Sequence, residues 1–171
     1  KGTIENMSAT YMKVQEYNEV VTKNVAEIRL YSNLIVMHPD ENAAKQVAGQ
    51  VNVYIEELNG ALDQMTDLTA KINNKKLTDD LNAYKTQVKI LETNIKATAD
   101  AYLGGSKSLA EREQQKMRAI VETLQGYQAI YAETLNSVVA TDAATGLQTA
   151  DFIQKIALVV NIIIITTILL V

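Results

Sequence analysis

The sequence predicts an all-α protein, an up-down-up-down antiparallel four-helix bundle whose fourth helix continues into a transmembrane segment. Apolar residues recur at alternating spacings of three and four along four stretches of the chain, which is the pattern of amphipathic helices. The 171 residues include one proline and seven glycines, fewer turn formers than an all-β chain of this length needs. The chain also closes on an almost wholly apolar run.

The first helix is expected over residues 3–37. Its series of core positions is interrupted by a polar residue at two places, Asn18 and Ser32. The series is Ile4, Met7, Tyr11, Val14, Asn18, Val21, Val25, Ile28, Ser32 and Ile35. The helix should close at His38-Pro39-Asp40, because proline cannot extend a helix and disfavours α geometry just before itself.

The second and third helices are expected over residues 41–73 and 78–103. The second series is Val47, Val51, Tyr54, Leu58, Ala61, Met65, Leu68 and Ile72. The third series is Leu77, Leu81, Tyr84, Val88, Leu91, Ile95, Thr98 and Tyr102. A polar stretch separates the two helices, Thr78 can cap the third, and Gly104-Gly105 should end it.

The fourth helix is expected from residue 107 onward, opened by Ser108 and Glu111 at the spacing of a capping box. Its series is Met117, Ile120, Leu124, Tyr127, Tyr131, Leu135 and Val138. Between Val139 and Asp151 the core positions are occupied by Ala, Thr and Gly. These small residues indicate either close packing of this helix against its neighbours or a less stable helical segment that moves relative to them. The connections are short, so successive helices should be antiparallel neighbours.

Residues 1–155 are expected to form the bundle, and Ile156–Val171 the start of a transmembrane helix. The polar residues of that segment are Asn161, Thr166 and Thr167. It is apolar on all sides, unlike a buried amphipathic core helix, and it is shorter than the ~20 residues that span a bilayer. We therefore expect a piece of a longer chain. Phe152 and Lys155 precede the segment, where an aromatic ring and a snorkelling cation belong.

Composition and charge exclude several classes of function. The net charge of −4, from 16 basic and 20 acidic residues, offers no basic stripe for nucleic acid. With no cysteine and one histidine, His38, the chain cannot build a di-iron Glu-x-x-His site or the usual nucleophile–base pairs. It also lacks a glycine-rich phosphate loop. We therefore expect no enzyme activity, no cofactor, no metal site and no nucleic-acid partner.

The layout resembles a known family. Four antiparallel helices, a polar start and a fourth helix feeding a membrane span resemble the extracytoplasmic four-helix-bundle sensor domain of bacterial methyl-accepting chemotaxis proteins. The stretch Val25-Ala26-Glu27-Ile28-Arg29-Leu30-Tyr31-Ser32-Asn33-Leu34-Ile35-Val36-Met37 looks like the end of that family's first helix, with an arginine ahead of an apolar run. The resemblance covers residues 1–171 in layout.

This resemblance implies a receptor of the bacterial cell membrane, with the bundle on the extracytoplasmic side. It implies a homodimer in which first helices pack together, a small ligand bound near the membrane-distal end at the subunit boundary, and a signal passed down the fourth helix. The family's aspartate and serine receptors place several arginines on the first helix, whereas this chain has Arg29 alone there. Alternatives are the input domain of a sensor histidine kinase, a tail-anchored coiled coil and a helical pore-forming toxin.

The three arginines are the main candidates for binding the ligand. Arg29 precedes the turn that ends the first helix, and Arg112 and Arg118 follow the turn that opens the fourth, so all three fall in the membrane-distal half. Guanidinium groups there suit a small carboxylate. The alternative is that they are solvated surface residues paired with nearby glutamates. Ser32 and Asn33 are weaker candidates, since a polar residue in an apolar series more often sets helix register.

Overall fold

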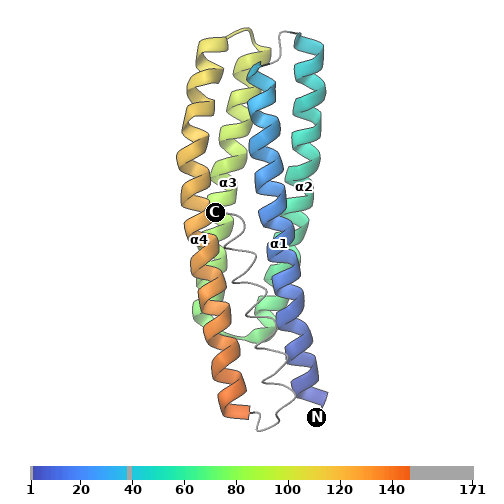
Figure 1. The fold of residues 1–171 in the computed structure, drawn as a ribbon, viewed down its shortest axis with the longest axis vertical. Helices are drawn as coiled ribbons and strands as arrows, with labels where there is room; N and C mark the ends of the chain where they lie inside the picture. The colour runs from blue at the N-terminus through green and yellow to red at the C-terminus, as the bar shows by residue number, and fades with distance from the viewer. Residues whose placement is uncertain (1, 38–39, 147–171) are drawn as a thin grey trace.

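The computed structural model describes residues 2–37 and 40–146, and within these ranges it is helical and contains no strand. Four helices pack together: α1 over Gly2–Met37, α2 over Glu41–Ile72, α3 over Lys75–Leu103 and α4 over Lys107–Gly146 (Figure 1). The predicted all-α class with four helices is therefore confirmed. The first helix also runs unbroken through Asn18, as predicted.

Several sequence predictions fall outside the part of the chain that the structure describes. These concern the membrane segment Ile156–Val171, the residues Phe152 and Lys155 ahead of it, the bundle residues 147–155 and the turn residue His38. In the ranges that are described, we find no helix with the length and apolar character needed to cross a bilayer.

The helices lie side by side along the long axis of the molecule (Figure 1). At one end, called here the upper end, α1 stops, α2 begins and α3 is connected to α4. The connection from α2 to α3 lies at the other, lower end, where α1 begins and the described part of α4 stops. The closest packing is between α1 and α2 and between α3 and α4. The bundle is thus two tightly packed helix pairs joined face to face.

The turn between α2 and α3 is built by two consecutive asparagines. Asn73 ends α2 in the left-handed conformation (φ 56°), which asparagine adopts more readily than most residues. Asn74 caps α3, and its Oδ1 accepts a hydrogen bond of 3.0 Å from the backbone N–H of Leu77. Thr78 was expected to be this cap, and that prediction is wrong: it lies inside α3 and its hydroxyl donates to the backbone carbonyl of Asn74.

The earlier start of α3 has a physical reason. Lys75 and Lys76 tolerate helix well, and each reaches an aspartate one turn later, Asp79 and Asp80. Because asparagine is among the best capping residues, the helix begins immediately after Asn74, at Lys75.

The turn between α3 and α4 uses the two glycines as predicted. Gly104 ends α3, and Gly105 takes a positive φ of 81°, which favours glycine. The first α4 hydrogen bonds run to the carbonyl of Ser106, so the helix begins at Lys107, the residue expected. Ser108 therefore lies within the helix, and the predicted capping box with Glu111 is not formed.

Buried side chains follow the predicted series closely. Every position of the third series is buried, and Tyr84 and Tyr131 are the largest side chains enclosed at the centre. Each fully buried large apolar side chain stabilises the fold by about 1.5–3 kcal/mol relative to exposure. Several polar residues share this interior: Asn24, Ser32, Thr69, Asn94, Thr98 and Thr134. Burying a polar group costs folding free energy unless the group is hydrogen-bonded, so these positions are candidates for a role other than core packing.

Candidate functional site

A line of polar bridges joins α1 to α4. The bridges are hydrogen bonds from the Tyr11 hydroxyl to Asp142, from the Gln128 amide to Thr22 and from the Gln114 amide to Asn33. Their α1 positions are 11 residues apart, close to three helical turns, so all project from one side of α1. As the residue number of the α1 member of a pair increases, the number of its α4 partner decreases, so the two helices run in opposite directions. We call this line of three pairs the α1–α4 seam.

The uppermost bridge holds one predicted site residue and lies beside two others. Gln114 Nε2 donates to Asn33 Oδ1 at 2.7 Å. Arg29 precedes Asn33 by four residues, and Arg118 follows Gln114 by four. Residues four apart share a helix face, and the helices are antiparallel, so both arginines lie one turn below the bridge on its two sides. The structure thus brings Arg29, Asn33 and Arg118 to one stretch of the seam.

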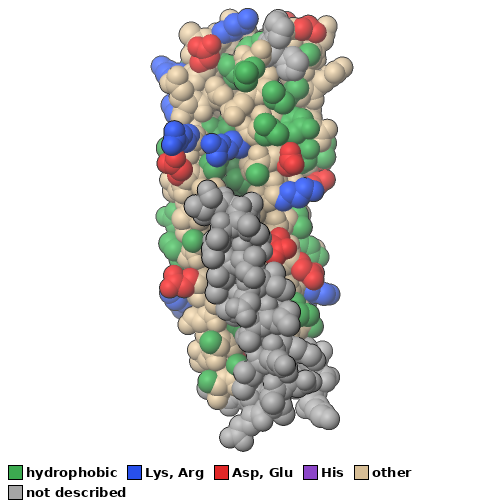
Figure 2. All heavy atoms as spheres, viewed as in Figure 1, with side chains coloured by type: hydrophobic (Ala, Val, Ile, Leu, Met, Phe, Trp, Pro, Cys, Tyr) green, Lys and Arg blue, Asp and Glu red, His purple; other side chains and the backbone are tan. Residues whose placement is uncertain are grey.

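The two arginines of this stretch remain accessible to a ligand. Arg29 is exposed, and it forms no ion pair with any residue that the structure describes. Arg118 is also exposed, and its Nε donates to Glu122 at 2.9 Å within α4. An exposed pair of this kind contributes little to stability, and the guanidinium keeps further donors for a ligand. Figure 2 shows Lys and Arg side chains side by side in the upper half of the face that carries α1 and α4.

Arg112 lies apart from this group. It is six residues before Arg118, a spacing that puts the two on different faces of α4. Its side chain is 69% exposed and lies 3.9 Å from the carboxylate of Glu113. The structure therefore does not bring the third arginine to the seam.

The uppermost bridge forms one polar layer with two buried side chains behind it, Ser32 and Asn94. Ser32 is fully buried, and its hydroxyl has no hydrogen-bond partner among the described residues. Asn94 on α3 donates from Nδ2 to the backbone carbonyl of Glu113 at 2.9 Å, while its Oδ1 has no partner in the described ranges. Glu113 adjoins Gln114 and Ser32 adjoins Asn33, so these groups lie at one level. We call Ser32, Asn33, Asn94 and Gln114 the upper polar layer.

Sequence reasoning missed two members of this layer. The three-four spacing of the fourth series, continued toward the N-terminus from Met117, reaches Gln114 and then Ala110. Ala110 is buried, so this continuation would have identified Gln114 as an inward-facing position. Asn94 sits immediately before the core position Ile95 and gave no comparable signal. Ser32, predicted as a ligand contact, faces the bundle interior instead of the surface that the arginines share.

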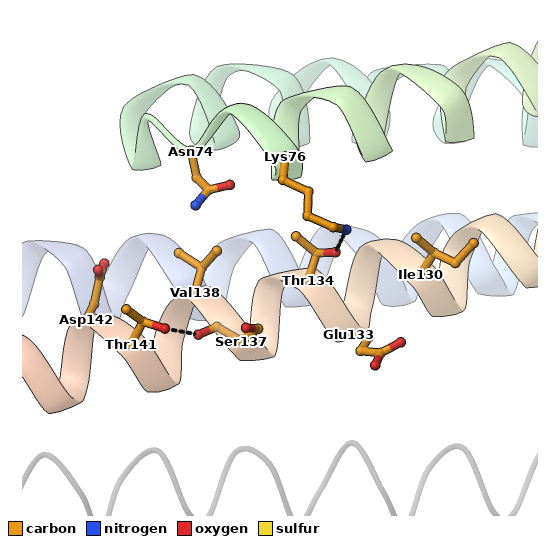
Figure 3. A pocket seen from close by; sticks show the side chains of 9 residues that line it. All are labelled: Asn74, Lys76, Ile130, Glu133, Thr134, Ser137, Val138, Thr141 and Asp142. Atoms are coloured by element: carbon orange, nitrogen blue, oxygen red, sulfur yellow. Dashed lines mark hydrogen bonds between the residues drawn. The ribbon is translucent and has the colours of Figure 1, made fainter.

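A second candidate site is a cavity at the lower end. It has a volume of about 460 Å³ and lies between the start of α3 and the second half of α4. Its lining residues are Asn74, Lys76, Ile130, Glu133, Thr134, Ser137, Val138, Thr141 and Asp142. Figure 3 shows Asn74 and Lys76 pointing from the α3 side toward α4, with Asp142 pointing toward α3 and Glu133 pointing away from it. We call this the α3–α4 cavity.

The charge on Lys76 is already engaged in this cavity. Its ammonium donates to Asp80 at 2.7 Å and to the Thr134 hydroxyl at 2.6 Å, and that hydroxyl donates to Asp80 at 2.5 Å. Burial alone would raise the pKa of Asp80, but hydrogen bonds from Lys76 and Thr134 and the Lys76 charge outweigh it and lower the pKa. The three groups therefore hold α3 against α4 as a closed network.

Neither candidate site has the ligands of a metal centre. In the part of the chain that the structure describes, no group of three or more His, Asp or Glu side chains is arranged to hold a metal ion. Comparison of the chain with protein-family models, with curated proteins and with solved structures found no match.

Proposed function

We propose that the chain is the extracytoplasmic ligand-sensing domain of a bacterial transmembrane chemoreceptor. It binds a small carboxylate in its upper, membrane-distal half and passes a conformational signal down α4 to a cytoplasmic signalling part. The proposal includes an up-down-up-down topology, a membrane span that begins at Ile156 and a homodimer. Support for the topology comes from the order of the bridges along the α1–α4 seam.

One observation carries the ligand assignment. Arg29 and Arg118 flank the Asn33–Gln114 bridge from two different helices, and both are exposed. Two guanidinium groups that face the same short stretch of surface can each donate to one carboxylate, which is a strong, charge-assisted contact. The amides of the bridge hold the backbones that carry the arginines at a fixed separation. This arrangement suits a dicarboxylate or an amino acid better than a neutral molecule.

The seam also offers a route for the signal. A ligand that bridges Arg29 and Arg118 favours one relative height of α4 and α1 at the top, and the polar bridges below transmit that change in height. Such a change occurs only if the ligand binds one arrangement of the two helices better than the other. Because α4 leads toward the predicted membrane segment, its displacement is the output of the domain.

A thermal-shift screen tests the proposed function. The 171-residue chain, held in a mild non-ionic detergent, is mixed with organic acids, amino acids and their neutral amides. We expect at least one carboxylate to raise the melting temperature in a saturable way, while its amide does not. Stabilisation by neutral compounds alone, or by none of the acids, would contradict the proposal.

A further inference from the structure

Two tyrosine rings meet on the surface between α1 and α2. Tyr31 on α1 and Tyr54 on α2 have ring centroids 5.3 Å apart, and their planes are inclined at 53°. Both rings pack against the hydrophobic core and remain partly exposed. Aromatic pairs prefer offset or tilted arrangements of this kind to a parallel sandwich. The pair therefore presents aromatic surface to solvent at the junction of two helices.

A carboxylate and an amide stand one turn from the two rings. Glu27 precedes Tyr31 by four residues and Gln50 precedes Tyr54 by four, so each shares a helix face with its tyrosine. The pKa of Tyr54 is raised, chiefly by a hydrogen bond with Tyr31 and then by partial burial. The Glu27 charge adds to this rise, and a hydrogen bond from Gln50 opposes it. We call Glu27, Tyr31, Gln50 and Tyr54 the α1–α2 cluster.

The Glu27 carboxylate is not neutralised by a neighbouring cation. Lys23 lies one turn before it on α1, yet no ion pair joins Glu27 to Lys23 or to another residue that the structure describes. Arg29 is two residues from Glu27, about 200° around the helix, and therefore lies on the opposite side of α1. Among the described residues, Glu27 is the one carboxylate or cation that shifts the pKa of Tyr54. The fixed charge beside the rings is thus negative.

Exposed apolar side chains adjoin the cluster. Leu30 and Val53, the residues immediately before the two tyrosines, are 55% and 45% exposed. Figure 2 shows hydrophobic side chains gathered over α1 and α2 in the upper half of the molecule, with acidic side chains next to them. Apolar surroundings of this kind favour a cation that carries methyl groups over a compact, strongly hydrated one.

We propose that the α1–α2 cluster binds a quaternary ammonium compound. The cation lies against Tyr31 and Tyr54, whose centroids at 5.3 Å are close enough for one charge to sit within about 6 Å of both. Glu27 supplies the opposite charge, and the methyl groups contact Leu30 and Val53. A quaternary ammonium has no N–H group to donate, so ring faces and a nearby carboxylate suffice to hold it. This is a second ligand site, and it goes beyond the proposed function.

Three other ligand classes suit the cluster less well. A carboxylate would be repelled by Glu27. A divalent metal ion needs several close oxygen ligands, and no group of three acidic or histidine side chains is arranged to hold one in the described ranges. A primary ammonium is strongly hydrated and carries three donors that need acceptors. The quaternary ammonium is the class that uses the rings, the charge and the apolar surface together.

An NMR titration with choline on the 171-residue chain, in non-ionic detergent and at constant ionic strength, tests the proposal. We expect a saturable upfield shift of the choline methyl resonance, because methyl groups over an aromatic face are shielded by the ring current. The uncharged isostere dimethylbutanol, in which carbon replaces the nitrogen, is the matched control. It should bind at least about fivefold more weakly, because it loses the attraction to both rings and to Glu27.

Matched variants separate the cluster from general attraction to an acidic surface. Tyr54→Leu should weaken choline binding about fivefold, whereas Tyr54→Phe keeps the ring and should stay within about twofold. Glu27→Gln should also weaken binding about fivefold. Glu19→Gln removes the same charge from an exposed position two turns below on α1, and binding should stay within about twofold. Arg29→Ala should not weaken choline binding, because Arg29 lies on the other side of α1.

The proposal is overturned if choline gives no saturable shift or if dimethylbutanol binds as tightly. It is also overturned if Tyr54→Phe loses as much affinity as Tyr54→Leu, or if Glu19→Gln weakens binding as much as Glu27→Gln. The isostere and the glutamate variants remain decisive even if Tyr54→Leu does not fold. These results bear on the α1–α2 cluster alone, because the carboxylate screen reports on the arginines of the α1–α4 seam.

Discussion

The side chain of Gln114 on α4 donates a hydrogen bond of 2.7 Å to the side chain of Asn33 on α1, across 81 residues of sequence. This bridge lies at the level of the buried Ser32 and Asn94 and one turn above Arg29 and Arg118. It therefore couples the interior of the upper half to the surface where we place the ligand.

The Asn33–Gln114 bridge should be measurable as a coupling energy. We expect Asn33→Ala and Gln114→Ala each to lower the free energy of unfolding by about 0.5–1.5 kcal/mol, the usual net value of a hydrogen bond. The double variant should cost less than the sum of the two, with a coupling of about 1 kcal/mol. Urea unfolding of the four proteins measures this. Strictly additive losses would show that the bridge does not contribute to stability.

The buried tyrosines should make the bundle sensitive to alkaline pH. Burial raises the pKa of Tyr131 to about 12, an effect partly offset by its hydrogen bond with Thr69, and burial also raises the pKa of Tyr84. In the unfolded chain both phenols ionise near the ordinary value of 10.0. The unfolded state therefore loses protons first, so stability is constant below about pH 10 and falls as the pH rises from 10 toward 12.

Urea unfolding between pH 8 and 12 checks this expectation. The slope above pH 10 should reach up to about 1.4 kcal/mol per pH unit for each buried tyrosine. Tyr131→Phe should make the slope shallower by the contribution of one tyrosine. A stability that is flat or rising across pH 10–12 would mean that these phenols are not buried in the neutral form.

The network of Lys76, Asp80 and Thr134 should stabilise the lower end. Thr134→Val removes the hydroxyl that links the other two, and we expect it to cost about 1–2 kcal/mol of unfolding free energy. Thr123→Val is the matched control, because Thr123 is exposed on the same helix and its hydroxyl donates to the backbone carbonyl of Ala119. Equal losses in the two variants would contradict the assignment.

The same network has a defined pH dependence. The pKa of Asp80 is lowered below its ordinary 3.8, so its contribution is present above that pH and lost as the pH falls below it. The cost of Thr134→Val should therefore be larger at pH 7 than at pH 2. A cost that is the same at both pH values would show that the hydroxyl does not act on the Asp80 carboxylate.

The proposed homodimer is tested by sedimentation. The chain in detergent should show a concentration-dependent shift from one copy to two, strengthened by the carboxylate ligand if that ligand binds at the subunit boundary. Detergent micelles without protein and the chain in a second detergent are the controls. A strict monomer at high concentration, with and without ligand, would contradict the proposed homodimer.

The helices could be predicted from the sequence because their signals are local. Spacings of three and four placed the core positions, and the paired glycines at 104 and 105 marked a turn without ambiguity. The predicted start of α3 was wrong by three residues, because Thr78 was expected to be the cap whereas the helix begins directly after Asn74. Lys75 and Lys76 were expected in the polar connection, but each pairs with an aspartate one turn ahead, which favours helix.

The candidate sites were harder to predict because they depend on register between helices. The sequence singled out Arg29, Asn33 and Arg118, but it could not tell which face of α4 lies against α1 or that Ser32 turns inward. The roles of Gln114 and Asn94 become visible only when α1, α3 and α4 are placed in register, because both residues form hydrogen bonds to another helix. The α3–α4 cavity joins residues from 74 to 142, and no local pattern predicts such a set.

The central claim is that Arg29 and Arg118 bind a carboxylate across the α1–α4 seam, and titration calorimetry of the three arginine variants tests it most directly. With the carboxylate found by the thermal-shift screen, Arg29→Ala and Arg118→Ala should each weaken the affinity about tenfold. Arg112→Ala, which removes the same charge from another face of α4, should bind within about twofold of the unaltered chain. All three should unfold within about 0.5 kcal/mol of it, because the side chains are exposed. Unchanged affinity in both Arg29→Ala and Arg118→Ala would contradict the claim.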